Sequence, residues 1–186
     1  MRSSLLLCVA ACSAAFQLSP HAASAPQNAQ RHAAIRCGPR VKIYSVGKEG
    51  RDEPWITTAI NEYTKRLRGT LEVECVWVRD DAALLASVRK SADASETAIV
   101  LDERGPTCTS TQFADRLYDG LEAGGSRLSF FIGGADGLPP QLKSEKRERL
   151  LSLSSLTFPH QVARLLLVEQ IYRSSEIRKG SGYHKD

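Results

Sequence analysis

The last residues of the chain place an aromatic ring, an imidazole and an ammonium group side by side, in Tyr183, His184 and Lys185. Such a trio can stack on a nucleobase and contact a phosphate. An imidazole also titrates near neutral pH, so His184 could accept a proton. The alternative is a frayed terminus, which is the default state of a polar chain end.

Two loop sequences further upstream could hold a ligand. Residues 133–138, Gly-Gly-Ala-Asp-Gly-Leu, follow an apolar run, and their glycines let the backbone approach a ligand closely. A tight structural turn is an equally good interpretation. Residues 153–160, Leu-Ser-Ser-Leu-Thr-Phe-Pro-His, combine small hydroxyl residues with apolar ones. Their backbone groups could bind a nucleobase edge, or the segment could connect a strand to a helix capped by Thr157.

Charged side chains recur after these loops, at Arg164, Glu169, Arg173 and Glu176. Glu169 and Arg173 are four residues apart, so they can pair on one helix face. For most of these side chains a solvated charge pair is favoured over a role in chemistry.

Common catalytic signatures are missing. The chain has no Gly-Lys-Ser/Thr phosphate loop, no His-Glu-x-x-His, no Cys-x-x-Cys, no Gly-x-Ser-x-Gly, and no Gly-x-Gly-x-x-Gly after the first strand. Beyond residue 40, Cys75 and Cys108 are too few for a disulfide framework. Cys75 lies in an apolar run that is typical of a small buried side chain. We therefore expect no metal site and no phosphate-binding loop.

The charge of the chain is divided unevenly. Residues 1–40 hold four arginines and no acid, which leaves 21 basic side chains to balance 21 acidic ones over residues 41–186. Residues 5–16 are an apolar stretch behind Arg2, and residues 17–40 are rich in Ala, Ser, Gln and His. A signal followed by a transit-like stretch resembles the two-part leaders of plastid proteins in algae with secondary plastids. We expect a plastid address for a cleaved leader; a mitochondrial presequence or an ordinary secretory signal is the alternative.

Strands and helices alternate along residues 41–186, which form one domain by length. Apolar and β-branched runs predict strands at 41–46, 71–78, 98–101 and 128–132, and a short one near 150. Helical spacing predicts helices from Pro54, Asp80, Thr109 and Pro159. We expect an α/β fold with a mostly parallel sheet and helices on both faces. Ligands bind such sheets at the carboxyl ends of the strands, so the loops after 101, 132 and 152 are the candidates. No apolar run approaches 18 residues, so no membrane-spanning helix is expected.

These segments together resemble one family, the RlmH-type SPOUT methyltransferases, over essentially all of residues 41–186. The most specific parts are Phe131–Leu138, Leu153–His160, Arg164–Arg173 and the ending Gly182–Lys185. The resemblance implies S-adenosylmethionine as methyl donor and N3 of a pseudouridine in large-subunit ribosomal RNA as acceptor. It also implies a trefoil knot near the C-terminus and a homodimer. One departure is the Gly180-Ser181-Gly182 segment before the tail.

The resemblance implies roles for particular residues. The positions that would hold the donor are Leu101, Gly133, Leu153, Ser154, Ser155, Leu156, Thr157 and Phe158. The positions that would be catalytic are His184, Tyr183 and Arg164. The imide proton must leave N3, and His184 is the preferred acceptor; His160 is second and is expected mainly to fix the donor loop. Arg164 and Arg173 would orient a phosphate or stabilise the developing anion.

Two alternatives remain open from the sequence. A flavodoxin-like nucleotide-binding enzyme fits the strand and helix order, although the phosphate loop is missing. A non-catalytic RNA-binding or ribosome-assembly module with the same fold is the other. The neutral charge of residues 41–186 predicts weak affinity for free RNA. We therefore expect an assembled organellar ribosome, rather than a naked transcript, to be the partner.

Overall fold

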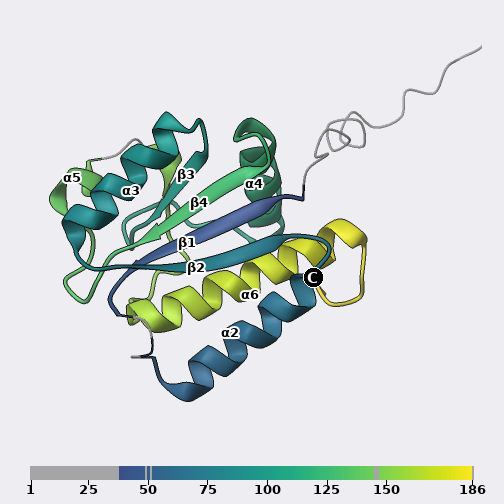
Figure 1. Cartoon of the computed structure of the whole chain (residues 1–186). Coiled ribbons are helices and arrows are strands. Elements are labelled where there is room, and N and C mark those ends of the chain that lie inside the picture. The colour runs from purple at the N-terminus through teal and green to yellow at the C-terminus, as the bar shows by residue number, and fades with distance from the viewer. Residues whose placement is uncertain (1–37, 49, 51, 145–146, 186) are drawn as a thin grey trace, which may run out of the picture.

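The computed structural model describes residues 38–48, 50, 52–144 and 147–185 (Figure 1). Almost all of the expected leader lies outside these residues. Five strands form one sheet in the order β2-β1-β4-β3-β5. Their bounds are β1 (Arg40–Val46), β2 (Glu72–Val78), β3 (Thr97–Leu101), β4 (Arg127–Ile132) and β5 (Leu150–Leu151). Every pairing between these strands is parallel.

Helices cover both faces of the sheet (Figure 1). One face packs against α2 (Pro54–Leu67), α4 (Ser110–Ala123) and α6 (His160–Lys179). The other packs against α3 (Asp81–Asp93) and the short α5 (Pro140–Lys143). The predicted α/β architecture is confirmed, while the trefoil knot stays a prediction. No helix among the described residues is long and apolar enough to cross a membrane.

The central strand β4 joins the two halves of the core. Its last five residues are buried, as its nearly unbroken apolar sequence predicts for a strand covered on both sides. Phe130 faces α4 and stacks on Phe113 with ring centroids 6.1 Å apart. Phe131 faces the other way and stacks on Tyr44 at 5.0 Å. This strand therefore fixes where the loop that follows it begins.

Local signals set the helix ends. The Asp80 side chain accepts a hydrogen bond from the Ala83 N–H at 2.9 Å and caps α3. Thr109 and Gln112 form a reciprocal capping box at the start of α4, as their spacing predicts. The alternative that Thr157 caps the last helix is wrong. Pro159 occupies the N-cap of α6, and no side chain there makes a capping hydrogen bond.

The charged stretch before β5 contains structure that its sequence did not indicate. It holds the end of α5 and a single 3-10 turn at Arg147–Arg149. The same strand-to-strand connection carries Leu138 and Leu142, both buried against the core on the α3 side of the sheet. Two apolar side chains among polar neighbours give too weak a periodicity to predict a one-turn helix.

Candidate functional site

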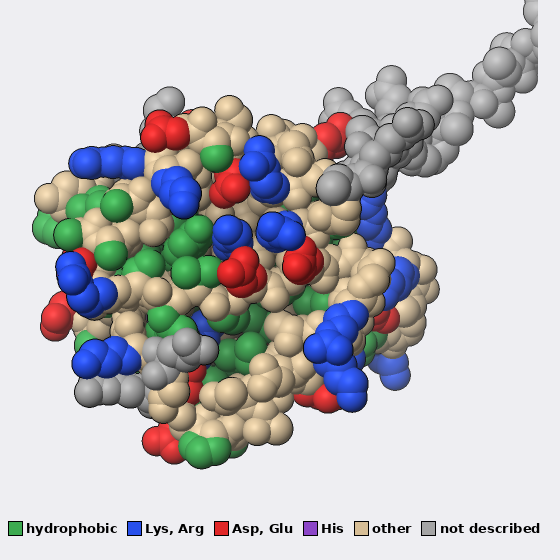
Figure 2. Space-filling view, viewed as in Figure 1, with side chains coloured by type: hydrophobic (Ala, Val, Ile, Leu, Met, Phe, Trp, Pro, Cys, Tyr) green, Lys and Arg blue, Asp and Glu red, His purple; other side chains and the backbone are tan. Residues whose placement is uncertain are grey.

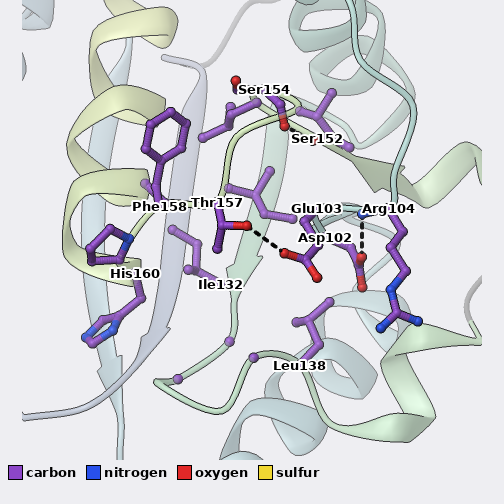
Figure 3. A pocket seen from close by; sticks show the side chains of 18 of the residues that line it. Asp102, Glu103, Arg104, Ile132, Leu138, Ser152, Ser154, Thr157, Phe158 and His160 are labelled. Atoms are coloured by element: carbon purple, nitrogen blue, oxygen red, sulfur yellow. Dashed lines mark hydrogen bonds between the residues drawn. The ribbon is translucent and has the colours of Figure 1, made fainter.

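A cavity of about 530 Å³ opens at the carboxyl ends of the strands, within the size range of small-molecule sites. Its walls come from the three loops that the sequence nominated, after β3, β4 and β5, together with the start of α6 (Figure 3). Most residues on these walls lie within 101–104, 132–138 and 151–160. Lys143 and Ala163 also line the cavity. Parallel strands end at one edge of a sheet, which is why loops distant in sequence meet here.

The loop after β4 is a tight turn and a cavity wall at once. The Gly137 N–H donates to the Gly134 carbonyl at 3.0 Å, and Gly137 has a φ of +83°. A Cβ on Gly133 would lie 2.3 Å from the Gly137 carbonyl oxygen and 2.7 Å from the Leu138 nitrogen. Position 133 therefore has no space for a side chain, and the turn presents backbone to the cavity. The tight-turn interpretation is confirmed, and the ligand-binding interpretation stays a prediction.

The loop after β3 crosses the chain that leaves β5. The Asp102 N–H donates to the Leu151 carbonyl at 3.0 Å, and the Ser152 N–H donates to the Pro106 carbonyl at the same distance. A Cβ on Gly105 would lie 2.8 Å from the Leu151 carbonyl carbon. The crossing thus requires glycine at 105. It also joins two of the cavity walls by main-chain hydrogen bonds.

The loop after β5 is held in shape by its own hydroxyl groups (Figure 3). The Ser152 hydroxyl donates to the Ser154 carbonyl at 2.7 Å, and the Ser154 hydroxyl accepts from the Leu156 N–H at 3.0 Å. The Thr157 hydroxyl donates to the Glu103 carboxylate at 3.1 Å. The small hydroxyl residues in this stretch therefore organise the loop and tie it to the loop after β3.

Seven of the eight positions expected to hold the donor line the cavity. They are Leu101, Gly133, Leu153, Ser154, Leu156, Thr157 and Phe158. Ser155 is exposed and does not line it. His160, expected to fix the loop, lies at the first position of α6 and also faces the cavity (Figure 3). The fold therefore brings seven of these eight positions and His160 to one cavity. Their role in holding the donor, which resemblance implied, stays a prediction.

Charged residues in the walls were not foreseen. Asp102, Glu103 and Asp136 bring three carboxylates, and Arg104 and Lys143 bring two cations. The Asp102 carboxylate accepts a hydrogen bond from the Arg104 N–H at 2.8 Å and so shapes this loop. The sequence signal that could have found residues 102–104 is their position directly after a predicted strand, where parallel sheets bind ligands. Among the described residues no group of three or more His, Cys, Asp or Glu is placed to hold a metal ion.

The expected catalytic tail folds back on the middle of α6 rather than over the cavity of its own chain. The Glu169 carboxylate accepts from Arg173 at 2.6 Å and from the Tyr183 hydroxyl at 3.1 Å. An Arg173 nitrogen lies 3.4 Å from Nδ1 of His184. Burial, with the neighbouring hydroxyl of Tyr63 and then Glu169, raises the pKa of Tyr183. Its phenol therefore keeps its proton at neutral pH and donates a hydrogen bond.

Arg164 occupies a different place from the other two predicted catalytic residues. Its side chain is 2% exposed and ion-paired with Asp52, which is 7% exposed. Its guanidinium lies 4.1 Å from the ring centroid of Trp77. Arg164 does not line the cavity, so its expected contact with substrate finds no support in this placement. Nearby Cys75 is partly buried, and burial raises the pKa of its thiol, as expected for a packing residue.

The fold and cavity define a class of protein that comparison with known families identifies. A family model described as predicted SPOUT methyltransferase matches residues 40–184. The chain belongs to the SPOUT methyltransferase family. The match begins at the first residue of β1 and ends at His184 in the tail, so it covers every described strand and helix.

Curated relatives specify the class further. A protein named ribosomal RNA large subunit methyltransferase H from Protochlamydia amoebophila is 47% identical over 146 residues, which is 78% of this chain and 99% of its own length. A protein of the same name from Synechococcus sp. (strain CC9605) is 44% identical over 146 residues, 78% of this chain and 96% of its own. One from Polynucleobacter asymbioticus is 39% identical over 150 residues, 79% and 99% of the two chains.

Proposed function

We propose that this chain transfers a methyl group from S-adenosylmethionine to N3 of a pseudouridine in large-subunit ribosomal RNA. The observation that carries the proposal is the cavity at the strand ends of a SPOUT family chain, walled by a glycine turn and a hydroxyl-braced loop. Relatives up to 47% identical over nearly their whole length carry the name of a large-subunit ribosomal RNA methyltransferase.

The cavity residues fit this donor chemically. Backbone at Gly133 and in the loop 152–158 would hold its nucleoside part, because both segments line the cavity. Asp102, Glu103 and Asp136 also line this space, and acidic residues suit a ligand that carries an ammonium and a sulfonium. When bound, the sulfonium supplies a methyl group with a good leaving group. The protein must then align the acceptor and take the proton that N3 loses.

The tail residues would serve the acceptor side. Arg173 is fixed by Glu169 and lies beside both Tyr183 and His184. His184 is the group that would take the N3 proton, because a ring nitrogen of an imidazole can accept one. Tyr183 keeps its proton and would donate a hydrogen bond or stack on the base. Neither tail residue lines the cavity of its own chain. A homodimer in which the tail of one protomer completes the cavity of its partner would bring them to the donor.

The neutral net charge of residues 41–186 bears on the form in which the RNA would be recognised. The 21 acidic side chains of residues 41–186 balance 21 basic ones, which gives little general attraction to free RNA. We therefore assign recognition to the folded shape of an assembled ribosome or large subunit. The acid-free, signal-like start of the chain supports delivery to a plastid, with its bacterial-type ribosomes, as the location; the mitochondrion is second.

Methyl transfer to purified ribosomes tests the proposal. The protein is incubated with labelled S-adenosylmethionine and bacterial large subunits, intact ribosomes or naked transcript, and the modified nucleoside is identified by mass spectrometry. We expect N3-methylpseudouridine on ribosomes and little on transcript. Equal rates on both would reject the ribosome assignment. Donor binding by calorimetry without transfer to any of the three would favour the non-catalytic module.

A further inference from the structure

Three tyrosines and two arginines form one cluster where the last turns of α2 and the second half of α6 meet the tail. The Tyr63 and Tyr172 ring centroids are 5.5 Å apart, and those of Tyr172 and Tyr183 are 5.0 Å apart. The Arg66 guanidinium lies over the first two rings at 5.8 and 5.9 Å, and Arg173 lies over Tyr183 at 4.9 Å. The cluster therefore joins α2, α6 and the tail into one continuous surface.

This end of the molecule is more basic than the chain as a whole. Residues 61–68 and 169–185 together hold seven basic and three acidic side chains. Each of the three acids is paired with a base of its own helix: the pairs are Glu62–Arg66, Glu169–Arg173 and Glu176–Lys179. In Figure 2, several Lys and Arg side chains are visible at the right-hand end, where Figure 1 shows α2 and α6 ending, and others are spread over the rest of this face. The local acids are thus already engaged.

Three cations on this surface remain available to a partner. Lys65, Arg68 and Lys185 are exposed, and none of them makes an ion pair with another described residue. Basic side chains in the last turn of a helix are explained by their favourable interaction with the helix dipole. This interaction does not account for Lys185, which lies beyond α6, or for the edge-to-face contact of Tyr183 with Tyr172.

We infer that the C-terminal end of α2, through Lys65 and Arg68, is part of the surface that binds the RNA backbone, continuous with the tail. The inference rests on the proposed function and deepens it, because it assigns substrate contacts to a helix outside both the cavity and the tail. Exposed cations bind phosphates, and aromatic rings with guanidinium groups offer stacking platforms to unpaired bases. The aromatic cluster orients the tail relative to these cations, so one RNA segment can reach both.

The inference also fits the neutral charge of the domain. A local basic surface does not capture RNA in general, but it adds a few phosphate contacts once the folded target is in place. Each neutralised phosphate adds about 0.7–0.9 to the slope of log affinity against log salt. Two such contacts therefore change the affinity by about tenfold between 50 and 200 mM salt.

The test compares two matched pairs of substitutions in the full chain. Lys65→Ala with Arg68→Ala removes the proposed contacts. Arg89→Ala with Lys90→Ala removes an exposed Arg and Lys from α3, on the opposite face of the sheet. Binding to bacterial large ribosomal subunits is measured from 50 to 200 mM salt, alongside methyl transfer and the molar mass in solution.

We expect the α2 pair to lower the salt slope by about 1.4–1.8, since each lost phosphate contact contributes about 0.7–0.9. KM for the subunits should rise about tenfold, whereas kcat, donor affinity and molar mass should match the parent chain. The α3 pair should match the parent in every measurement.

Equal salt slopes for the α2 and α3 double variants would overturn the inference. So would a lower molar mass for the α2 pair, because the surface would then join copies of the chain. A parent that binds subunits with this slope but transfers no methyl group would refute the proposed function and leave the RNA surface intact.

Discussion

The buried ion pair between Arg164 and Asp52 should dominate the stability of the region that holds the start of α6. Both side chains are more than 90% buried. Three of their polar atoms, Oδ1 of Asp52 and Nε and Nη1 of Arg164, have no hydrogen-bond partner among the described residues. Asp52 is thus the charge that compensates the buried guanidinium, and Asp52→Ala would leave a cation inside the core.

Removing one partner of a buried pair costs about 3–5 kcal/mol. Trp77 would still face the guanidinium at 4.1 Å, so we take the lower end, about 3 kcal/mol. In a domain of this size a loss of 1 kcal/mol lowers Tm by roughly 3 °C. Asp52→Ala should therefore lower Tm by about 10 °C in thermal unfolding followed by circular dichroism.

An exposed ion pair in the same domain provides the control. Arg40 and Glu72 lie 2.8 Å apart with side chains 50% and 62% exposed. Glu72→Ala should cost at most about 1 kcal/mol, because water screens exposed pairs. The double variant Asp52→Leu with Arg164→Met should recover most of the lost stability, since it removes both charges. If Asp52→Ala and Glu72→Ala unfold at the same temperature, the burial argument is refuted.

Three further predictions concern the site and one helix end. Gly133→Ala should abolish S-adenosylmethionine binding in calorimetry, because its Cβ would lie 2.3 Å from a carbonyl oxygen, whereas Gly38→Ala, with no atom within 4 Å, should bind as the parent does. Thr157→Val should weaken donor binding several-fold by releasing Glu103, and hydrogen exchange in the loop 152–158 should rise; unchanged exchange would count against the tether. The Asp80 pKa lies below its usual value because of the hydrogen bond from the helix N–H and the adjacent arginine. Its charged form thus stabilises the fold above the unfolded pKa of about 3.9, and stability is lost as pH falls through the lower folded value. Asp80→Ala should differ from the parent at pH 7 and converge with it in acid, once the pH is below the folded pKa of Asp80, in urea unfolding.

The order of strands and helices could be predicted from the residue pattern. Local signals mark the elements, and all strands form one parallel sheet. The apolar run of β4 and the capping box at Thr109 each determine structure within a few residues, so neither depends on distant contacts. The tight packing around Gly133 and Gly105 could not be predicted in this way. Glycine shows that backbone can approach closely, but only the fold shows which backbone does so.

One part of the site could be predicted from the residue pattern, and another only from the family resemblance. The parallel sheet alone nominated three loops, and all three form the cavity. The identity of the donor positions came from resemblance, and the burial of Arg164 against Asp52 was inaccessible to both. These two residues are 112 positions apart, and an arginine at helical spacing among other charges looks the same whether it faces water or the core.

The crossing of residues 102–106 with 151–152 also constrains when the site can exist. Strand β5 joins the sheet only beside β3, with Leu150 opposite Val100, so the two walls meet across some fifty residues of intervening chain. Strand β5 and residues 151–163, which supply much of the cavity wall, follow the other four strands in the chain. The cavity therefore cannot be complete until this last part of the chain has joined the sheet core around β4. A chain emerging from a ribosome would have most of its strands before it could bind a methyl donor, so donor binding would act as a check on completed folding.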